Sequence, residues 1–322
     1  MSEPLFLKPY FQNKMWGGSK LEKRFGYDIP SDHTGECWAI SAHKHGPAKI
    51  KNGIYAGKTL NELWDNNREL FGNASGDKFP MLTKILDARM DLSVQVHPDD
   101  SYAMEHEHEL GKTECWYIIE AEEGSELIYG HYAKTREELA EMIHNNDWNK
   151  LLRRIPVKAG EFYYVPSGTI HALGGGIMAL ETQQSSDTTY RVYDFDRVDP
   201  NSGKKRELHV DQSIAVITVP HVDPKLDIKE YRVGDAKVTC YVKSDFFTVY
   251  RWELCNNGKA EFERGEAPYT LASVLSGSGT LTVDGKEYKL AKGDHMILPF
   301  DVKSWSISGN LRIIASEPGK RV

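Results

Sequence analysis

The 322-residue sequence has few cysteines, no long apolar run and no strong excess of charge of either sign. Its cysteines lie far apart and form no Cys-x-x-Cys pair, which argues against a disulfide framework and a cysteine zinc site. The longest apolar stretch, near Ile214 to Val219, is far shorter than the roughly 18 residues of a transmembrane helix. The N-terminus has no basic start followed by an apolar run, so a signal peptide is not indicated. We therefore expect a cytoplasmic protein that does not enter a membrane.

The charge balance also limits the class of partner. The formal net charge is −7, and the 40 lysines and arginines are spread along the whole length. A nucleic-acid partner would require a basic patch, so we expect none. A small anionic substrate is still compatible with this balance, because a few local cations can override a mild global charge. The length corresponds to one large domain or two ordinary ones.

Much of the chain predicts short strands separated by turns. Val238–Val242 and Phe247–Leu254 are rich in β-branched and aromatic residues, and a turn signal follows at Asn256-Asn257-Gly258. Leu281–Val283 is followed by Asp284-Gly285, a dipeptide that readily forms a hairpin turn. Frequent short strands of this kind are typical of a sandwich or barrel.

Helical patterns interrupt the strands in three places, which we expect to be insertions at about residues 58–72, 98–110 and 132–154. The first has Leu60, Leu63 and Trp64 at helical spacing. The third contains Thr135 and Glu138, a capping-box signature. A proline near the start of the second suits the first turn of a helix.

Residues 160–171 and 293–304 share one pattern. Each begins with glycine and an acidic residue, continues as an apolar strand, and has proline six residues after the glycine. This repetition predicts two copies of one β-barrel unit, with a boundary near Pro220 to Pro224. The first copy ends in His171, whereas the second has Ser304, so we expect only the first copy to bind a metal.

One predicted strand presents a candidate metal ligand. Along Leu92–Pro98, apolar residues alternate with Ser93, Gln95 and His97, which therefore share one face. His97 is a good zinc ligand, and Gln95 is a weaker oxygen donor. Taken alone, a Gln-x-His strand is more often an ordinary polar face.

Two further residues complete the candidate set. Glu114 lies in a following strand on the same face as Lys112; a carboxylate there is usually solvated, but a neighbouring strand would aim it at the same point. Gly160, Pro166, Gly168 and His171 have the spacing of the second sequence motif of the cupin superfamily, although His171 could instead be a core histidine at a turn. Two imidazoles, a carboxylate and an amide suit zinc, with room for water or substrate. The remaining histidines are weaker candidates, and His43 and His45 could belong to a surface loop.

The resemblance to cupins implies a fold class. It is mainly β, with two cupin-like double-stranded β-helix (jelly-roll) units and a small helical insertion. We expect residues 1–222 to form the metal-bearing catalytic unit, which carries the helical insertions. Residues 223–322 are expected to form a degenerate cupin-like β unit without a metal site.

Several motifs together resemble the type I mannose-6-phosphate isomerases, in their short bacterial branch. They are the Gln-x-His strand, Trp16-Gly17-Gly18, Gly35–Trp38, Phe79–Leu86, Lys112-Thr113-Glu114 and Pro166–Ala172. The resemblance covers roughly residues 6 to 215. One departure is clear, because the family's common His-Lys-Pro-Glu reads Gly111-Lys112-Thr113-Glu114 here.

The resemblance implies roles for individual residues. It implies one zinc ion per chain on Gln95, His97, Glu114 and His171, and a phosphorylated sugar as substrate. It also implies catalytic residues, namely Arg191, Lys112, Lys84 and Glu181. The implied substrate-binding residues are Trp16, Ser93 and Arg197, with Arg197 on the phosphate. Without the resemblance, Arg191 could equally be a surface arginine that pairs with Asp194 or Asp196.

The implied reaction interconverts mannose 6-phosphate and fructose 6-phosphate through a cis-enediol. Zinc and Arg191 would stabilise the enediolate, and a carboxylate or a lysine of lowered pKa would move the proton. Two alternatives stay open: another metal-dependent cupin, such as an oxygenase or epimerase, and a non-catalytic sugar-binding cupin. The sequence leaves open whether the protein is a monomer or a homodimer.

Overall fold

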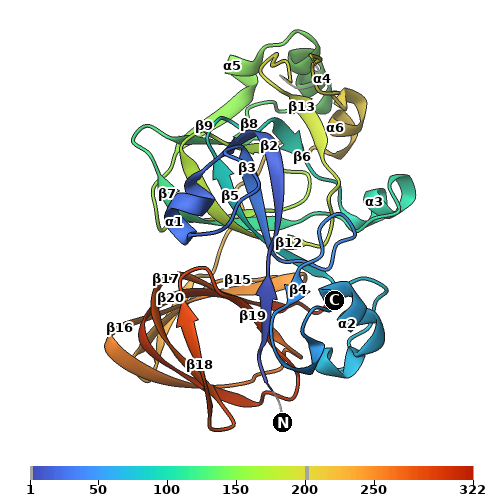
Figure 1. Cartoon of the computed structure of the whole chain (residues 1–322). Helices are drawn as coiled ribbons and strands as arrows, with labels where there is room; N and C mark the ends of the chain where they lie inside the picture. The colour runs from blue at the N-terminus through green and yellow to red at the C-terminus, as the bar shows by residue number, and fades with distance from the viewer. Residues whose placement is uncertain (1–2, 200–202, 322) are drawn as a thin grey trace.

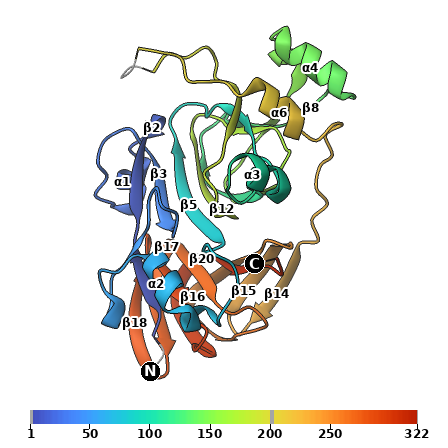
Figure 2. The same cartoon turned by 90° about the vertical axis from the view of Figure 1, so that its right-hand side faces the viewer.

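The computed structural model describes residues 3–199 and 203–321. The chain forms two β units, one above the other in both views (Figures 1 and 2). The upper unit contains most of the first two thirds of the chain, and the lower unit contains the C-terminal third. This arrangement confirms the mainly β, cupin-like fold predicted from the sequence.

The upper unit encloses its interior between two antiparallel sheets. The six-stranded sheet has the order β10 (Phe162–Val165), β7 (Glu114–Ala121), β12 (Ile177–Gln184), β5 (Met81–Ala88), β2 (Tyr10–Gly18) and β3 (Thr34–Ile40). The five-stranded sheet has the order β13 (Tyr190–Tyr193), β6 (Val94–Val96), β11 (His171–Leu173), β8 (Glu126–His131) and β9 (Leu152–Pro156).

The three predicted helical insertions are present. They contain α2 (Leu60–Asn66) with the 3₁₀ turn η2 (Arg68–Phe71), α3 (Asp100–His106), and α4 (Arg136–His144) with α5 (Trp148–Leu151). Thr135 caps α4 as predicted, because its hydroxyl accepts the backbone N–H of Glu138 at 3.2 Å. Three short elements were not predicted: α1 (Lys20–Phe25), η1 (Gly53–Tyr55) and α6 (Val210–Val216). Every helix in the described part of the chain is too short or too polar to traverse a bilayer.

The lower unit is one nine-stranded sheet that includes two strands from the N-terminal part of the chain. Its order is β14 (Lys229–Val233), β15 (Ala236–Lys243), β16 (Phe247–Glu263), β20 (Ser304–Pro318), β17 (Thr270–Val283), β19 (His295–Leu298), β1 (Leu5–Lys8) and β4 (Lys49–Ile50), with β18 (Lys286–Ala291) on β17. The chain therefore crosses between the units more than once. Its last crossing, from α6 to β14, runs along the outside (Figure 2). The division near residue 222 stays a prediction.

The predicted turn after Leu254 is wrong. β16 continues through it, and the register against β20 shifts between Leu254 and Gly258. Asn256 and Asn257 have φ of 56° and 52°, so they form a bulge inside one long strand rather than its end. The same residue types that favour a turn also tolerate the positive φ of a bulge. The hairpin at Asp284-Gly285 is confirmed, because it joins β17 to β18 with φ of 48° and 77°.

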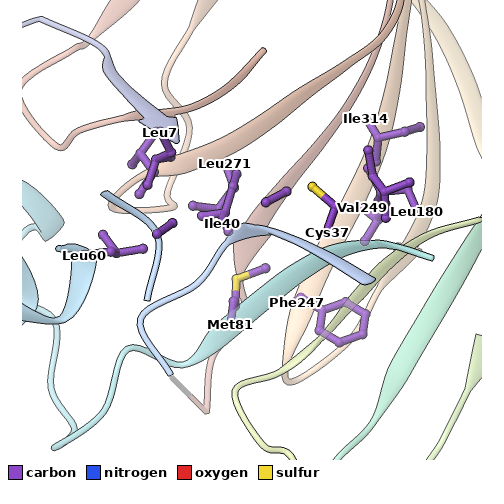
Figure 3. Packing of buried hydrophobic residues seen from close by; sticks show 14 of the residues in the cluster. Leu7, Cys37, Ile40, Leu60, Met81, Leu180, Phe247, Val249, Leu271 and Ile314 are labelled. Atoms are coloured by element: carbon purple, nitrogen blue, oxygen red, sulfur yellow. The ribbon is translucent and has the colours of Figure 1, made fainter. Parts of the chain in front are cut away.

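One apolar cluster joins the two units. Figure 3 shows Ile40 and Leu180 from the upper unit beside Val249, Leu271 and Ile314 from the lower one. All five side chains are buried. Because each unit covers an apolar face of the other, we expect them to unfold together.

Phe71→Ala is expected to destabilise this junction by about 3–5 kcal/mol, the usual effect of deleting a fully buried aromatic ring. Phe71 is fully buried, and the centroid of its ring lies 5.2 Å from that of Trp64. The ring of Tyr269, just before β17 in the lower unit, lies 5.4 Å away. Urea unfolding measures the loss. Tyr132→Ala is the control, because Tyr132 is 53% exposed and its replacement should change stability by no more than about 0.5 kcal/mol. Equal losses in the two variants would contradict this account of the junction.

Candidate active site

The four predicted metal ligands meet inside the upper unit. Gln95 of β6 is paired with His171 of β11, and His97 immediately follows β6. Glu114 begins β7 in the opposite sheet. The structure therefore brings together residues from both sheets, at strand ends far apart in the sequence.

The two imidazoles are oriented by backbone carbonyls. His97 donates its Nδ1–H to the carbonyl of Thr188 at 2.9 Å, and His171 donates its Nδ1–H to that of Thr169 at 2.8 Å. Each neutral ring therefore keeps an unprotonated Nε2. These Nε2 atoms lie 3.4 Å and 3.3 Å from the two carboxylate oxygens of Glu114. Carbonyl partners of this kind fix the tautomer that a metal-binding histidine needs.

The charge state of this cluster suits a cation. Burial lowers the pKa of His97 to about 3, with Lys112 adding to the effect, and burial also lowers the pKa of His171. Burial opposes ionisation of Glu114, but Lys112 and the two histidines together hold its pKa well below its usual range. Neither oxygen of Glu114 has a hydrogen bond of good geometry among the described residues. One ligand atom each from His97, Glu114 and His171 lies within 4.8 Å of the others, so these residues fit a divalent metal.

Gln95 borders the same point. Its side-chain Nε2 is 3.3 Å from Nε2 of His171. Because an amide's oxygen and nitrogen are assigned from the hydrogen-bond network, a flip of this group would direct Oε1 to the same place. An oxygen there would add a neutral ligand to the two imidazoles and the carboxylate.

A cavity of about 300 Å³ lies beside this cluster, and its lining includes Gln95 and Lys112, which contact the clustered side chains. Seven of the predicted site residues line it: Trp16, Lys84, Ser93, Gln95, Lys112, Glu181 and Arg191. Arg197 is not among the lining residues. The sequence interpretation did not identify four charged lining residues, namely Lys14, Glu36, Asp187 and Arg206.

Lys84 lies in a buried network of charges. Its Nζ is 3.5 Å from Oε2 of Glu181 and 3.9 Å from Oε2 of Glu36. Burial would lower the pKa of Lys84, but these two carboxylates raise it above its usual value. Of the two kinds of base considered from the sequence, a carboxylate or a lysine with lowered pKa, Lys84 therefore does not match the second. Burial and the charge of Glu114 instead raise the pKa of Glu181, which accepts a hydrogen bond from Trp116 Nε1 at 3.0 Å.

Lys112 lies beside the metal ligands. Its Nζ is 3.1 Å from Nε2 of His97 and 3.1 Å from Oε2 of Glu114. The ammonium group therefore balances the buried carboxylate in this structure. Since Lys112 also lines the cavity, its side chain can reach a sugar oxygen there.

The three arginines near the cavity differ in their partners. Arg191 donates from Nη1 to the carbonyl of Glu207 at 2.8 Å, while its buried Nε has no partner among the described residues. Asp194 pairs instead with Arg206, at 2.6 Å and 2.8 Å, and with Arg197, at 2.5 Å. Arg197 also donates from Nε to the carbonyl of Asp194 at 3.1 Å and from Nη1 to the carbonyl of Asp91. These bonds direct Arg197 away from the cavity and leave Arg191 and Arg206 at its wall.

Comparison with known proteins decides the family. A family model described as "Phosphomannose isomerase type I, catalytic domain" matches residues 5–120, and one described as "Mannose-6-phosphate isomerase, cupin domain" matches residues 237–318. A mannose-6-phosphate isomerase from Streptococcus mutans is 57% identical, with 98% of each chain covered. The chain belongs to the type I phosphomannose isomerase family.

Solved structures agree with this family assignment. The crystal structure of mannose 6-phosphate isomerase from Bacillus subtilis has a TM-score of 0.95 at 52% identity, covering 98% of this chain and 100% of that one. The apo form from Salmonella typhimurium has a TM-score of 0.76 at 16% identity, covering 99% of this chain and 100% of that one. The latter likeness shows the fold alone.

The departure from the family motif at Gly111 has a steric explanation. A Cβ atom at this position would lie 2.5 Å from the backbone nitrogen of Asp100 and 2.5 Å from the carbonyl carbon of Asp99. The start of α3 therefore occupies the space that any side chain at position 111 would need. In this member of the family, a histidine at position 111 would require α3 to move.

Proposed function

We propose that this chain interconverts mannose 6-phosphate and fructose 6-phosphate, with one zinc ion on His97, Glu114, His171 and Gln95. Relatives that share more than half of its residues over nearly the full length bear the name mannose-6-phosphate isomerase. The observation that carries the proposal is the buried His97–Glu114–His171 cluster, which lies behind Gln95 and Lys112 at the wall of a cavity lined by cations and carboxylates. A redox-inert Lewis acid suits this mixed ligand set. Nothing in the site specifically favours an oxygenase, an epimerase or a non-catalytic cupin.

Zinc bound at this cluster would polarise the sugar oxygens on C1 and C2. Arg191, whose Nε is buried and without a partner among the described residues, stabilises the negative charge that develops on those oxygens. Lys84 stays protonated beside Glu181 and adds a second positive charge at the same wall.

Glu181 is the base that we assign to the proton transfer between C1 and C2. Its pKa is raised toward neutral pH, and a carboxylate with such a pKa can both accept and return a proton. Trp116 and Lys84 fix its two oxygens. Lys112 and Ser93 donate to the sugar hydroxyls, and Trp16 covers an apolar part of the cavity wall.

We assign the phosphate to Arg206 rather than to Arg197, because Arg206 lines the cavity and Arg197 does not. Arg206→Ala is expected to raise the KM for mannose 6-phosphate by about 10- to 100-fold, the equivalent of a charged hydrogen bond of about 1.5–3 kcal/mol. Arg197→Ala, which removes the other partner of Asp194, serves as the matched control and should raise KM much less. Steady-state kinetics of the two variants measure the difference. A larger increase in KM in Arg197→Ala than in Arg206→Ala would show that Arg197 binds the phosphate instead.

The activity itself is tested by a coupled assay that reports fructose 6-phosphate formed from mannose 6-phosphate. We expect turnover by the purified chain, and none with unphosphorylated mannose at the same concentration. Iron in the purified protein together with oxygen uptake would overturn the proposal in favour of an oxygenase. A cytoplasmic location and the choice between monomer and homodimer stay predictions.

A further inference from the structure

A second group of potential metal ligands lies outside the catalytic cluster: His43, His45 and Asp187. The two histidines belong to a turn after β3, which is closed by a hydrogen bond from the backbone N–H of Gly46 to the carbonyl of His43 at 3.0 Å. Asp187 comes from the segment that joins β12 to β13. One ligand atom from each residue lies within 4.8 Å of the others.

Two of the three ligands are already at the spacing that a shared metal requires. Nδ1 of His45 lies 3.0 Å from Oδ2 of Asp187, and the rings of His43 and His45 are 4.7 Å apart between centroids. Ligand atoms on one tetrahedral zinc ion, at bonds of about 2.0–2.1 Å, are themselves roughly 3.3 Å apart. The side chain of His45 is 54% exposed, so it can turn to close the remaining gap.

His43 supplies a second, independent indication. The residue is only 5% exposed, and its buried Nε2 has no hydrogen-bond partner among the described residues. Its Nδ1 accepts only a long contact, 3.3 Å, from the backbone N–H of His45. Burial lowers the pKa of His43, so the ring is neutral at pH 7 and can act as a ligand. A buried polar atom without a partner calls for an unseen water or ion.

The surroundings favour a cation. The three residues line a surface cavity of about 340 Å³ that also contains Glu107 and Glu109. Lys44 opposes a cation here, but its Nζ lies 3.3 Å from Glu109 Oε1. Lys84 also acts on His43 and Asp187, and it is paired with Glu181 and Glu36. A cation can therefore reach this cavity from solvent and meet a carboxylate and two imidazoles.

We infer that His43, His45 and Asp187 form a second binding site for a divalent transition metal such as zinc, separate from the catalytic cluster. Asp187 lines the catalytic cavity as well, and the carbonyl of the next residue, Thr188, orients His97. A metal here ties the segment before β13 to the turn after β3, and so holds the backbone that positions a catalytic ligand.

The test is a zinc count per chain. Metal-free protein is dialysed to equilibrium against micromolar free zinc, and bound zinc is measured by mass spectrometry. We expect two zinc ions in the wild type and one in His45→Ala. This substitution removes the exposed ligand and leaves His43 and Asp187 in place. His144→Ala, which removes an exposed histidine at the end of α4, should retain two.

His97→Ala separates this inference from the proposed function. It should lose the catalytic ion and keep the second, so that the double variant His45→Ala/His97→Ala binds none. The wild type could instead bind a single ion that is lost in His45→Ala and kept in His97→Ala. That result would support the second site and contradict the proposed catalytic zinc site. Equal zinc content in the wild type and His45→Ala would overturn the second site.

Discussion

His171→Ala is expected to remove the catalytic metal and to lower kcat/KM by at least about a thousandfold. His171 is fully buried, and its Nε2 lies 3.3 Å from both Glu114 and Gln95, so its loss breaks the ligand set at its centre. A metal acting as a Lewis acid supplies several kcal/mol of transition-state stabilisation, and each 1.36 kcal/mol is tenfold in rate. Metal analysis and the coupled assay on the same preparation measure both effects.

Two comparisons keep this result interpretable. His144→Ala changes an exposed histidine and should leave metal content and activity unchanged. Circular dichroism and thermal unfolding show whether His171→Ala still folds, and His171→Gln retains a polar side chain of similar size if it does not. Full activity in a His171 variant shown to lack the metal would remove the Lewis-acid role.

Arg191→Ala is expected to lower kcat by about 10²–10³-fold, the usual effect of removing a donor aimed at developing negative charge. The side chain makes one backbone hydrogen bond, from Nη1 to Glu207, so its loss should change stability little. Steady-state kinetics at saturating mannose 6-phosphate isolate kcat, because binding is then complete. Arg191→Lys restores the charge without the planar donor group and should recover only part of the rate.

An unchanged kcat with a raised KM would place Arg191 in ground-state binding instead. The same experiment on Arg206→Ala should show that opposite pattern, since a phosphate anchor contributes to binding before and during reaction. The two arginines are therefore expected to separate into a kcat residue and a KM residue.

The relative positions of the candidate metal ligands could be predicted in part, because they depend on local geometry. Alternation along β6 places Gln95 and His97 with respect to one another, and the glycine–proline turn before β11 places His171. These rules need no knowledge of distant contacts. The prediction that Glu114 lies on a strand next to the Gln-x-His strand is wrong, because β7 belongs to the opposite sheet. Only the family resemblance named all four residues as one ligand set.

Which arginine lines the cavity could not be predicted in this way. Arg197 and Arg206 lie in one polar segment after β13, and no periodicity indicates which of them faces the cavity. The choice depends on Asp194, which accepts hydrogen bonds from both, and on the carbonyl of Asp91, which engages Arg197 alone. The contact between Arg197 and Asp91 joins residues 106 positions apart.

The charge state of Lys84 could not be predicted from the sequence, for a related reason. Strand pairing sets Glu181 directly opposite Lys84, and Glu36 reaches the same ammonium from the neighbouring strand β3. From sequence, a buried lysine is expected to have a lowered pKa, because burial penalises the charged form. Two carboxylates from neighbouring strands reverse that sign. The pairing of β1 with β19 could not be predicted either, because the two strands lie at opposite ends of the sequence.

The most direct test of the central claim is chelation followed by zinc reconstitution. The purified protein is stripped of metal, assayed with mannose 6-phosphate, and assayed again as zinc is returned in steps. We expect activity to fall to background in the stripped protein and to return in proportion to the first equivalent of zinc per chain. Undiminished conversion to fructose 6-phosphate by protein shown to contain no metal would contradict the account.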